Sequence, residues 1–159
     1  MTQEDKQLLL KDLCARLPYG VKILHEGWNY EWDDELSTVE RVVGIDDEFI
    51  YTKVIDTHNG EEYRDDKWPI DTFDDKLFLC PMSSMTEEER EEWTDLFMVS
   101  ITQELEQYTD ELEAEKVAPS LFAKSHTLSI DWLNAHHFDY RGLIPKGLAI
   151  AVTKENNPY

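Results

Sequence analysis

Apolar residues recur every three or four positions near the start of the chain, and this spacing predicts an amphipathic helix over residues 2–17. The apolar stripe consists of Leu9, Leu10, Leu13, Cys14 and Leu17. Thr2 and Asp5 have the spacing of a capping box, in which each side chain bonds to the backbone N–H of the other residue. Pro18 is expected to end the helix. In this interpretation Asp12 lies on the solvent side and Cys14 is a buried thiol.

Residues 21–80 alternate apolar and polar positions over short runs, which predicts β-strands. The predicted strands are 21–25, 28–32, 39–45, 49–55, 63–68 and 77–80. Asp46-Asp47 predicts a tight turn that joins two of them into a hairpin. Asn59-Gly60 predicts a second turn, because both residues tolerate positive φ angles. Four to six short strands of this kind are typical of an antiparallel meander or a small open barrel.

A long helix is predicted over residues 86–116, where Thr86 and Glu89 have the spacing of a second capping box. Its apolar stripe consists of Trp93, Leu96, Phe97, Ile101, Leu105, Tyr108 and Leu112. Since a helix of this length is unusual in a small domain, a break near Thr109-Asp110 is left open. Residues 117–120 are interpreted as a connector, 129–137 as a short helix and 148–152 as a last strand at a sheet edge.

These elements predict an α+β fold in a single domain of residues 1–159. Residues 1–85 form the N-terminal helix and the β-rich part, residues 86–118 the long acidic helix, and residues 119–159 a C-terminal helix-turn-strand. A small antiparallel sheet is expected to pack against the N-terminal helix, the long acidic helix and the C-terminal helix-turn-strand.

The charge is very unevenly distributed along the chain. The formal net charge is −20, and residues 119–159 hold four Lys/Arg against three Asp/Glu. Fifteen basic residues against 35 acidic ones exclude an ordinary nucleic-acid binder and disfavour an anionic membrane, because both need a basic surface. A basic protein partner is the favoured alternative, and the oligomeric state stays open.

Two widely separated cysteines, Cys14 and Cys80, form neither a metal-ligand pair nor a disulfide framework, and both are interpreted as buried thiols. The first residues are acidic and polar, unlike a signal peptide, and no apolar run is long enough to span a membrane. A cytoplasmic protein is therefore expected.

The segment 131–142 concentrates the residue types that carry chemistry. Its candidate site residues are Trp132, Asn134, His136, His137, Asp139, Tyr140 and Arg141. We interpret them as a structural clasp, in which Arg141 pairs with Asp139, Asp131 or an acid of the long helix and Gly142 supplies a positive φ.

Two chemical alternatives for the same segment stay open. The first is a metal site, although adjacent histidines on a helix point about 100° apart and share one ion poorly. The second is acid–base catalysis by a histidine with Asp131 or Asp139. No nucleophile motif accompanies either alternative, so no catalytic residue, metal ligand or cofactor is assigned.

Two further surfaces are candidates for binding. Glu88, Glu91, Glu92 and Asp95 lie on the acidic face of the predicted long helix and could form an interface. Such a row could also imitate the phosphates of DNA. Trp28, Tyr30 and Trp32 alternate along a predicted strand, which favours core packing or, if they are exposed, a protein interface.

Three blocks resemble one family of small proteins. They are LLLKDLCARLPYGVK at residues 8–22, CPMSSMTEE at 80–88 and NAHHFDYRGLIPKGLA at 134–149. In this order the blocks resemble proteins of gut anaerobic bacteria and of their phages or mobile elements. The resemblance covers about a quarter of the chain, carries no known activity, and implies a phage or mobile-element setting in a bacterial cytoplasm.

The sequence therefore favours a non-enzymatic acidic protein that binds another protein. The first alternative is a DNA-mimic inhibitor of a host enzyme that acts on nucleic acid. The second is a metal-dependent or histidine-dependent hydrolase.

Overall fold

The computed structural model describes residues 1–29, 34–55, 61–107 and 111–159. Within these ranges the chain has an α+β fold with three α-helices and one six-stranded sheet, joined by short 3-10 turns. The helices are α1 (Gln3–Arg16), α2 (Glu87–Leu105) and α3 (Glu111–Ala135). The strands are β1 (Lys22–Asn29), β2 (Asp34–Ile45), β3 (Phe49–Ile55), β4 (Glu62–Pro69), β5 (Lys76–Leu79) and β6 (Ala149–Ala151).

The strands lie in the order β4-β3-β2-β1-β5-β6 and form a mixed sheet that does not close into a barrel. Every neighbouring pair is antiparallel except β5–β6, which is parallel. The expectation of a purely antiparallel sheet is therefore wrong at this edge. Parallel pairing needs a long crossover, and α2 and α3 provide it between β5 and β6.

The β2–β3 hairpin confirms the turn predicted at Asp46-Asp47. Oδ1 of Asp46 accepts hydrogen bonds from the backbone N–H groups of Glu48 and Phe49, at 2.8 and 2.7 Å. The two strands predicted over 21–25 and 28–32 are wrong as separate elements, because β1 runs without a break from Lys22 to Asn29. β2 also begins earlier than predicted. The Asn59-Gly60 turn lies outside the described residues, although β3 and β4 on either side of it pair antiparallel.

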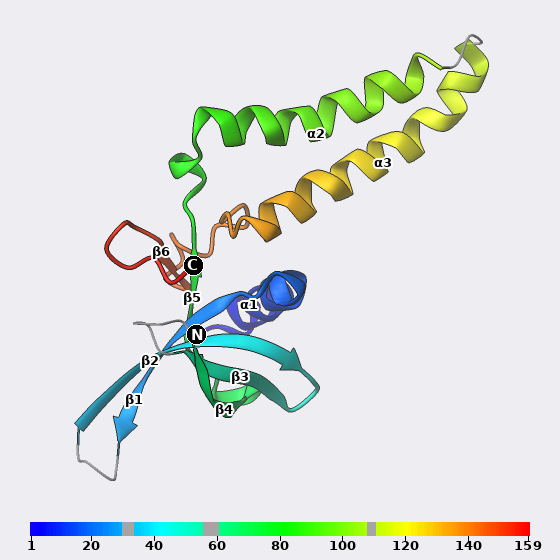
Figure 1. Ribbon diagram of the computed structural model, residues 1–159. Helices are drawn as coiled ribbons and strands as arrows, with labels where there is room; N and C mark the ends of the chain where they lie inside the picture. Colours follow the sequence, from blue (N-terminus) through cyan, green and yellow to red (C-terminus); the bar gives the residue numbers. More distant parts are fainter. Residues whose placement is uncertain (30–33, 56–60, 108–110) are drawn as a thin grey trace.

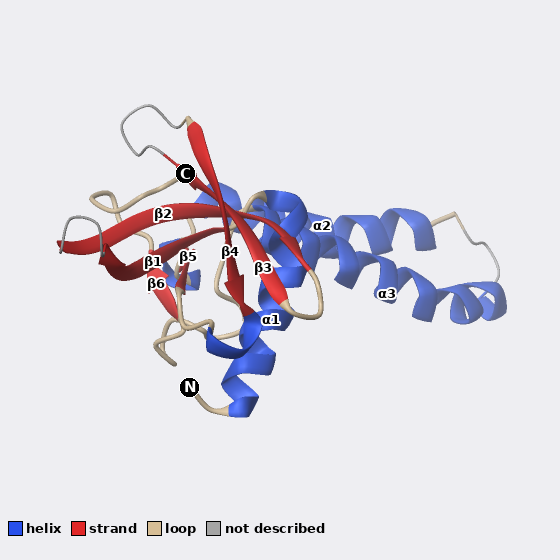
Figure 2. Ribbon diagram, turned by 90° about the horizontal axis from the view of Figure 1, so that it is seen from below, coloured by secondary structure: helices blue, strands red, loops and turns tan. Residues whose placement is uncertain are grey.

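Helix α1 begins at the predicted capping box and crosses one face of the sheet (Figure 2). Leu9 and Leu13 are buried there against Val42, Ile50 and Leu77 of the strands. Burial of a leucine of this kind contributes roughly 1.5–3 kcal/mol to the free energy of unfolding. The predicted apolar stripe is wrong in two places. Asp12 is wholly buried, and Cys14 is exposed.

Helices α2 and α3 form an antiparallel hairpin, here called the arm, that projects away from the sheet (Figure 1). The single helix predicted over 86–116 is wrong, because α2 ends at Leu105 and α3 begins at Glu111. The break that the length suggested falls in this interval, and residues 108–110 lie outside the described ranges.

The connector predicted at residues 117–120 is also wrong, because this segment is helical and Pro119 lies inside α3. A proline in a helix interior costs about 3 kcal/mol. Packing of α3 along α2 compensates, and this long-range contact cannot be read from the local sequence. The helix predicted over 129–137 is the last part of α3, which ends at Ala135.

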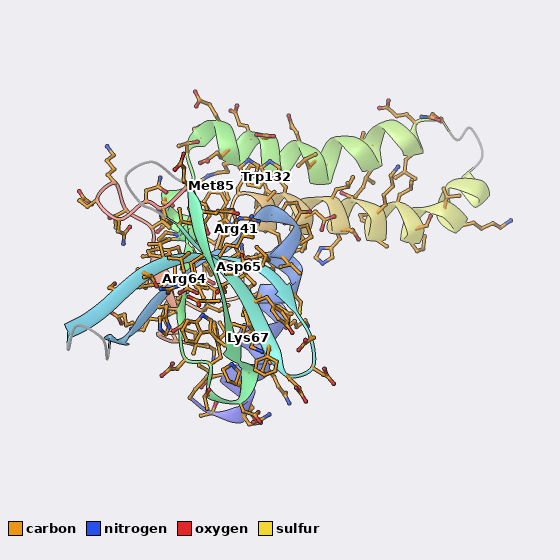
Figure 3. The ribbon with its side chains drawn as sticks, turned by 60° about the horizontal axis from the view of Figure 1, so that its bottom comes forward. Arg41, Arg64, Asp65, Lys67, Met85 and Trp132 are labelled. Atoms are coloured by element: carbon orange, nitrogen blue, oxygen red, sulfur yellow. The ribbon has the colours of Figure 1, made fainter. Side chains whose placement is uncertain are left out.

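A second apolar cluster lies where the arm joins the body. Met85, Trp132, Leu133 and Phe138 are buried there, and Trp93 and Ile130 pack against them. Figure 3 places Met85 and Trp132 at this junction. The arm is thus held at one end by its own small core.

Candidate functional site

The predicted clasp begins at the end of α3, which finishes in a Schellman motif. The N–H of Phe138 donates to the carbonyl of Leu133 at 2.9 Å, and the N–H of His137 donates to that of Asn134 at 3.1 Å. His137 has a φ of 56°, and it is the one non-glycine residue with a positive φ in the described ranges. Glycine usually occupies this position because a Cβ is strained there.

The turn after α3 is bonded to the end of β5. The N–H of Cys80 donates to the carbonyl of His137 and the N–H of Asp139 donates to the carbonyl of Cys80, both at 2.8 Å. The carboxylate of Asp139 accepts from the N–H groups of Leu143 and Ile144, also at 2.8 Å. Both oxygens of Asp139 are therefore engaged in shaping a turn, in which Gly142 has the expected positive φ.

Arg141 pairs neither with Asp139 or Asp131 nor with a described acid of the predicted long helix, so this prediction is wrong. Its Nε lies 3.6 Å from Oδ1 of Asp12 in α1. Arg16 binds the same carboxylate, with its Nε 2.6 Å from Oδ2. Two guanidinium groups therefore share one buried carboxylate, and Nη1 of Arg141 is buried with no acceptor in the described part of the chain.

The two histidines of the clasp occupy different environments. His136 is exposed, and its ring stacks on Trp132 with centroids 3.9 Å apart. His137 is buried and stacks on Tyr159 at 4.0 Å. Burial, with the nearby charge of Arg16, lowers the pKa of His137 to about 4, so the ring is neutral at pH 7.

The remaining predicted residues of the clasp also hold the structure together. Trp132 and Asn134 are buried, and the hydroxyl of Tyr140 donates to Oδ1 of Asn134 at 3.1 Å. Neither histidine of the segment bonds to a carboxylate within the described residues. The geometry is therefore that of a clasp between α1, α3 and β5. Across the same ranges, no group of three or more His, Cys, Asp and Glu side chains is placed to hold a metal ion.

The acidic face of the arm has a different character. Glu88, Glu91, Glu92 and Asp95 are all exposed on α2, and none forms an ion pair with a described residue. The sequence of α2 has seven acids and a single basic residue, Arg90. This surface therefore presents negative charge that the rest of the described chain does not neutralise.

Charges on the sheet are arranged differently. Nη2 of Arg41 lies 2.5 Å from Glu62, and Nη2 of Arg64 lies 2.6 Å from Asp66. Lys53 lies 3.5 and 3.6 Å from Glu62 and Asp65. Figure 3 shows Arg41, Arg64 and Asp65 on the strands, apart from the arm. Exposed acids without a described ion pair also occur outside the arm, for example Asp47 and Asp74. What distinguishes α2 is that its acids lie close together on one helix.

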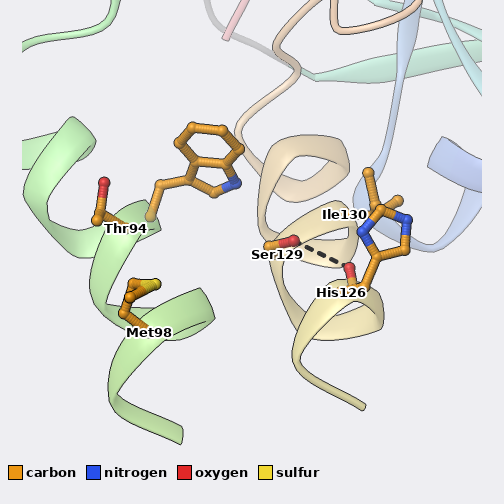
Figure 4. Close-up of a pocket in the computed structure, with 6 residues that line it drawn as sticks. Thr94, Met98, His126, Ser129 and Ile130 are labelled. Carbon is orange, nitrogen blue, oxygen red and sulfur yellow. Dashed lines mark hydrogen bonds between the residues drawn. The ribbon is translucent and has the colours of Figure 1, made fainter. Parts of the chain in front are cut away.

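A cavity of about 300 Å³ opens between α2 and α3, and we call it the socket. Figure 4 shows Thr94 and Met98 on the α2 side and His126, Ser129 and Ile130 on the α3 side. Trp93 completes the lining, which is largely apolar. The buried Nε1 of Trp93 has no acceptor in the described ranges, although most buried donors in proteins have one.

The socket could not be predicted from the sequence, because its two walls belong to segments that were predicted as separate elements. Trp93 was predicted as part of the apolar stripe of the long helix, and no role was predicted for His126. The antiparallel return of α3 brings them together, and the hydroxyl of Ser125 donates to the carbonyl of Leu96 at 3.2 Å across this interface.

A second cluster that the sequence did not predict lies on the sheet, where β1, β2, β3 and β4 contribute His25, Glu40, Thr52 and Trp68. Nδ1 of His25 lies 2.9 Å from Oδ1 of Asp75, and the ring of His25 stacks on Trp68 with centroids 3.9 Å apart. The indole N–H of Trp68 donates to Glu40 at 2.8 Å, and Thr52 donates to the same oxygen at 2.6 Å. Glu40 is wholly buried.

The electrostatics of this cluster favour a charged His25. The hydrogen bond to Asp75 raises the pKa of His25, and the charges of Asp75, Glu40 and Asp66 add to this effect. Burial raises the pKa of Asp75, and the hydrogen bond with His25 opposes this shift by lowering it. The pair could not be predicted from local sequence, because Asp75 is fifty residues away from His25.

The aromatic run is only partly visible. Tyr30 and Trp32 lie outside the described residues, and only the backbone of Trp28 is described, as part of β1. The interpretation of this run therefore stays a prediction.

No α-helix in the described ranges combines the length and the apolar character needed to cross a membrane. Comparison with known protein families, curated proteins and solved structures finds no match to this chain. The geometry of the arm is therefore the principal guide to function, and the socket together with the acidic face of α2 is the candidate functional site.

Proposed function

We propose that this protein is a non-enzymatic accessory protein whose arm binds a basic region of a second protein. The observation that carries the proposal is the row of exposed acids on a helical hairpin that projects from the body. Glu88, Glu91, Glu92 and Asp95 have no ion-pair partner among the described residues. Uncompensated charge of one sign steers a partner of the opposite sign and suppresses wrong partners.

The shape of the chain supports this assignment. The arm contacts the body only near one end (Figure 1), so most of the length of α2 and α3 is free to approach another molecule. The clasp, by contrast, uses Asp139, His137 and Arg16 to join helices and strands, which is an architectural task.

We further propose that the protein acts in the cytoplasm of a bacterium, in a phage or mobile-element setting. The similarity of the three sequence blocks to proteins of that setting supports this part of the proposal. Cys14 and Cys80 are both free thiols, and Cys14 is exposed, which suits a reducing compartment.

The test compares two charge variants of equal net charge. One replaces Glu88, Glu91, Glu92 and Asp95 by the isosteric amides. The control replaces Glu4, Asp47, Glu48 and Asp74, which are exposed acids outside the arm. Each immobilised protein is exposed to a bacterial lysate at about 50 and 500 mM salt, where surface charge is weakly and strongly screened. The most enriched basic protein is then purified and its affinity measured by calorimetry.

We expect the native protein and the control variant to bind this partner with equal affinity and with a steep salt dependence. The arm variant should bind it at least tenfold more weakly, because the steering charges are absent. Equal binding by the arm variant would refute the proposal. Competition by duplex DNA for a DNA-binding partner would identify the more specific function of a DNA mimic.

A further inference from the structure

The socket and the acids of α2 lie on the same part of the arm. Glu91 precedes Thr94 by three residues, and Asp95 precedes Met98 by three residues. Residues three apart on a helix are neighbours on its surface. Thr94 and Met98 line the socket, so Glu91 and Asp95 lie beside its α2 edge.

Exposed apolar side chains extend the socket toward the free end of the arm. Met98 is 54% exposed at its edge. On α3, Phe122 precedes the lining residue His126 by one helical turn and is 51% exposed. The result is an apolar strip with a cavity at one point and carboxylates alongside it.

The size of the socket suits a side chain. A cavity of about 150 Å³ in another protein holds one benzene molecule, so about 300 Å³ has room for one or two aliphatic or aromatic side chains. An amphipathic helix that lies in a groove inserts such anchors at intervals of three and four residues. The carboxylates beside the groove complement lysine and arginine residues that flank the anchors.

We propose that the socket receives an apolar anchor from a basic amphipathic helix of the partner protein. This inference rests on the proposed function and adds the form in which the partner binds. A second copy of this chain is a poor occupant, because its net charge of −20 would place one acidic arm against another.

The test uses two fourteen-residue peptides of equal charge. In the first, leucines recur at intervals of three and four between lysines, and in the second each leucine is replaced by alanine. Binding to the full chain is measured by fluorescence anisotropy of labelled peptide. Two variants alter the socket without changing charge: Met98→Gln at its edge, and Ser129→Leu, which fills it.

Leu128→Gln is the matched control, because Leu128 is an exposed apolar residue of α3 that does not line the socket. Circular dichroism verifies that each variant is folded. Met98 is half exposed, so Met98→Gln keeps the test informative if Ser129→Leu impairs folding.

We expect both socket variants to weaken the leucine peptide roughly tenfold, the scale on which one buried apolar side chain acts. Leu128→Gln should change its affinity less than twofold. The alanine peptide should bind weakly and equally to all three variants, because only charge attracts it.

The outcomes separate this inference from the proposed function. If the amide variant of the four arm acids loses both peptides while the socket variants retain the leucine peptide, the acidic interface stands and the socket inference is wrong. If neither set of variants changes binding, both are wrong. A concentration-dependent dimer in sedimentation equilibrium that Met98→Gln abolishes would show that a second copy covers the socket, and would overturn the inference.

Discussion

The guanidinium group of Arg16 donates a hydrogen bond of 2.7 Å from Nη2 to the carbonyl oxygen of Phe138. Arg16 lies at the end of α1, and Phe138 lies in the turn that ends the arm. Arg16 is wholly buried, and its charge is balanced by Asp12 one helical turn earlier. The bond therefore joins the helix that covers the sheet to the root of the arm.

Replacement of Arg16 by methionine should lower the free energy of unfolding by about 3–5 kcal/mol, because it removes the principal counter-charge of a wholly buried carboxylate. The double variant Asp12→Leu, Arg16→Met should recover part of this loss, since the buried carboxylate is removed as well. Recovery should be incomplete, because Arg141 loses its ion pair with Asp12. Urea unfolding followed by circular dichroism measures the native protein, the single variants Arg16→Met and Asp12→Leu, and the double variant. Strictly additive effects of the two single changes would contradict the coupling.

The backbone of His137 predicts an unusual order of substitutions. His137→Gly should leave stability within about 1 kcal/mol of the native value, because relief of the positive φ offsets the loss of the stack on Tyr159. His137→Val should destabilise by about 2 kcal/mol or more, since a β-branched residue suits this conformation worst. Thermal unfolding gives the order, and a valine variant as stable as the glycine variant would show that the turn relaxes.

The buried ring of His137 should also make the protein sensitive to acid. Its pKa is about 4 in the folded protein, below the ordinary value near 6.5. Between pH 4 and 6.5 the ring is therefore protonated in the unfolded chain and neutral in the folded protein. The contribution of the neutral His137 ring to the free energy of unfolding is therefore complete above pH 6.5 and is lost as the pH falls toward 4. His137→Asn tolerates the positive φ and does not titrate, so its stability should fall less over this window in urea titrations. If the free energies of unfolding of the native protein and of His137→Asn fell equally with pH, a group other than His137 would be responsible for the acid sensitivity.

His25 should produce the opposite dependence. Its pKa is raised by Asp75, with Glu40 and Asp66 also facing it, and Trp68 covers its ring. The stabilisation is complete below the ordinary pKa near 6.5 and is lost as the pH rises through the raised value. The free energy of unfolding of native protein should fall more steeply from pH 6 to 9 than that of His25→Gln. The exposed His126→Gln is the control and should follow the native curve.

The two thiols should differ in reactivity. Cys14 is exposed, whereas burial raises the pKa of the half-buried Cys80 and reduces its thiolate fraction. Ellman's reagent should therefore give one fast phase and one phase at least tenfold slower. Cys14→Ser should abolish the fast phase, and loss of the slow phase instead would reverse the assignment.

Local signals in the sequence predicted the features whose partners are three or four residues apart. Both capping boxes, Thr2 with Asp5 and Thr86 with Glu89, form as expected. The Asp46 turn and the positive φ of Gly142 are also present. These features need only the conformational preferences of a few neighbouring residues, so the chain determines them wherever it folds.

Features that depend on contacts between residues far apart in the sequence were predicted wrongly. Asp12 is buried because it pairs with Arg16. Arg16 in turn donates to the carbonyls of Leu133 and Phe138, more than one hundred residues away in sequence. Pro119 was predicted to lie in a connector, but it lies inside α3, where packing along α2 outweighs its local cost.

The sequence by itself determined an α+β chain with an acidic amphipathic segment, because hydrophobic periodicity and charge are properties of neighbouring residues. The tertiary structure alone decided that this segment folds back as an arm, that Arg141 faces Asp12, and that Trp93 and His126 enclose a socket. Each of these depends on the direction in which the chain returns after a turn. That direction is set by the burial of distant apolar surfaces against one another, which no short stretch of sequence encodes.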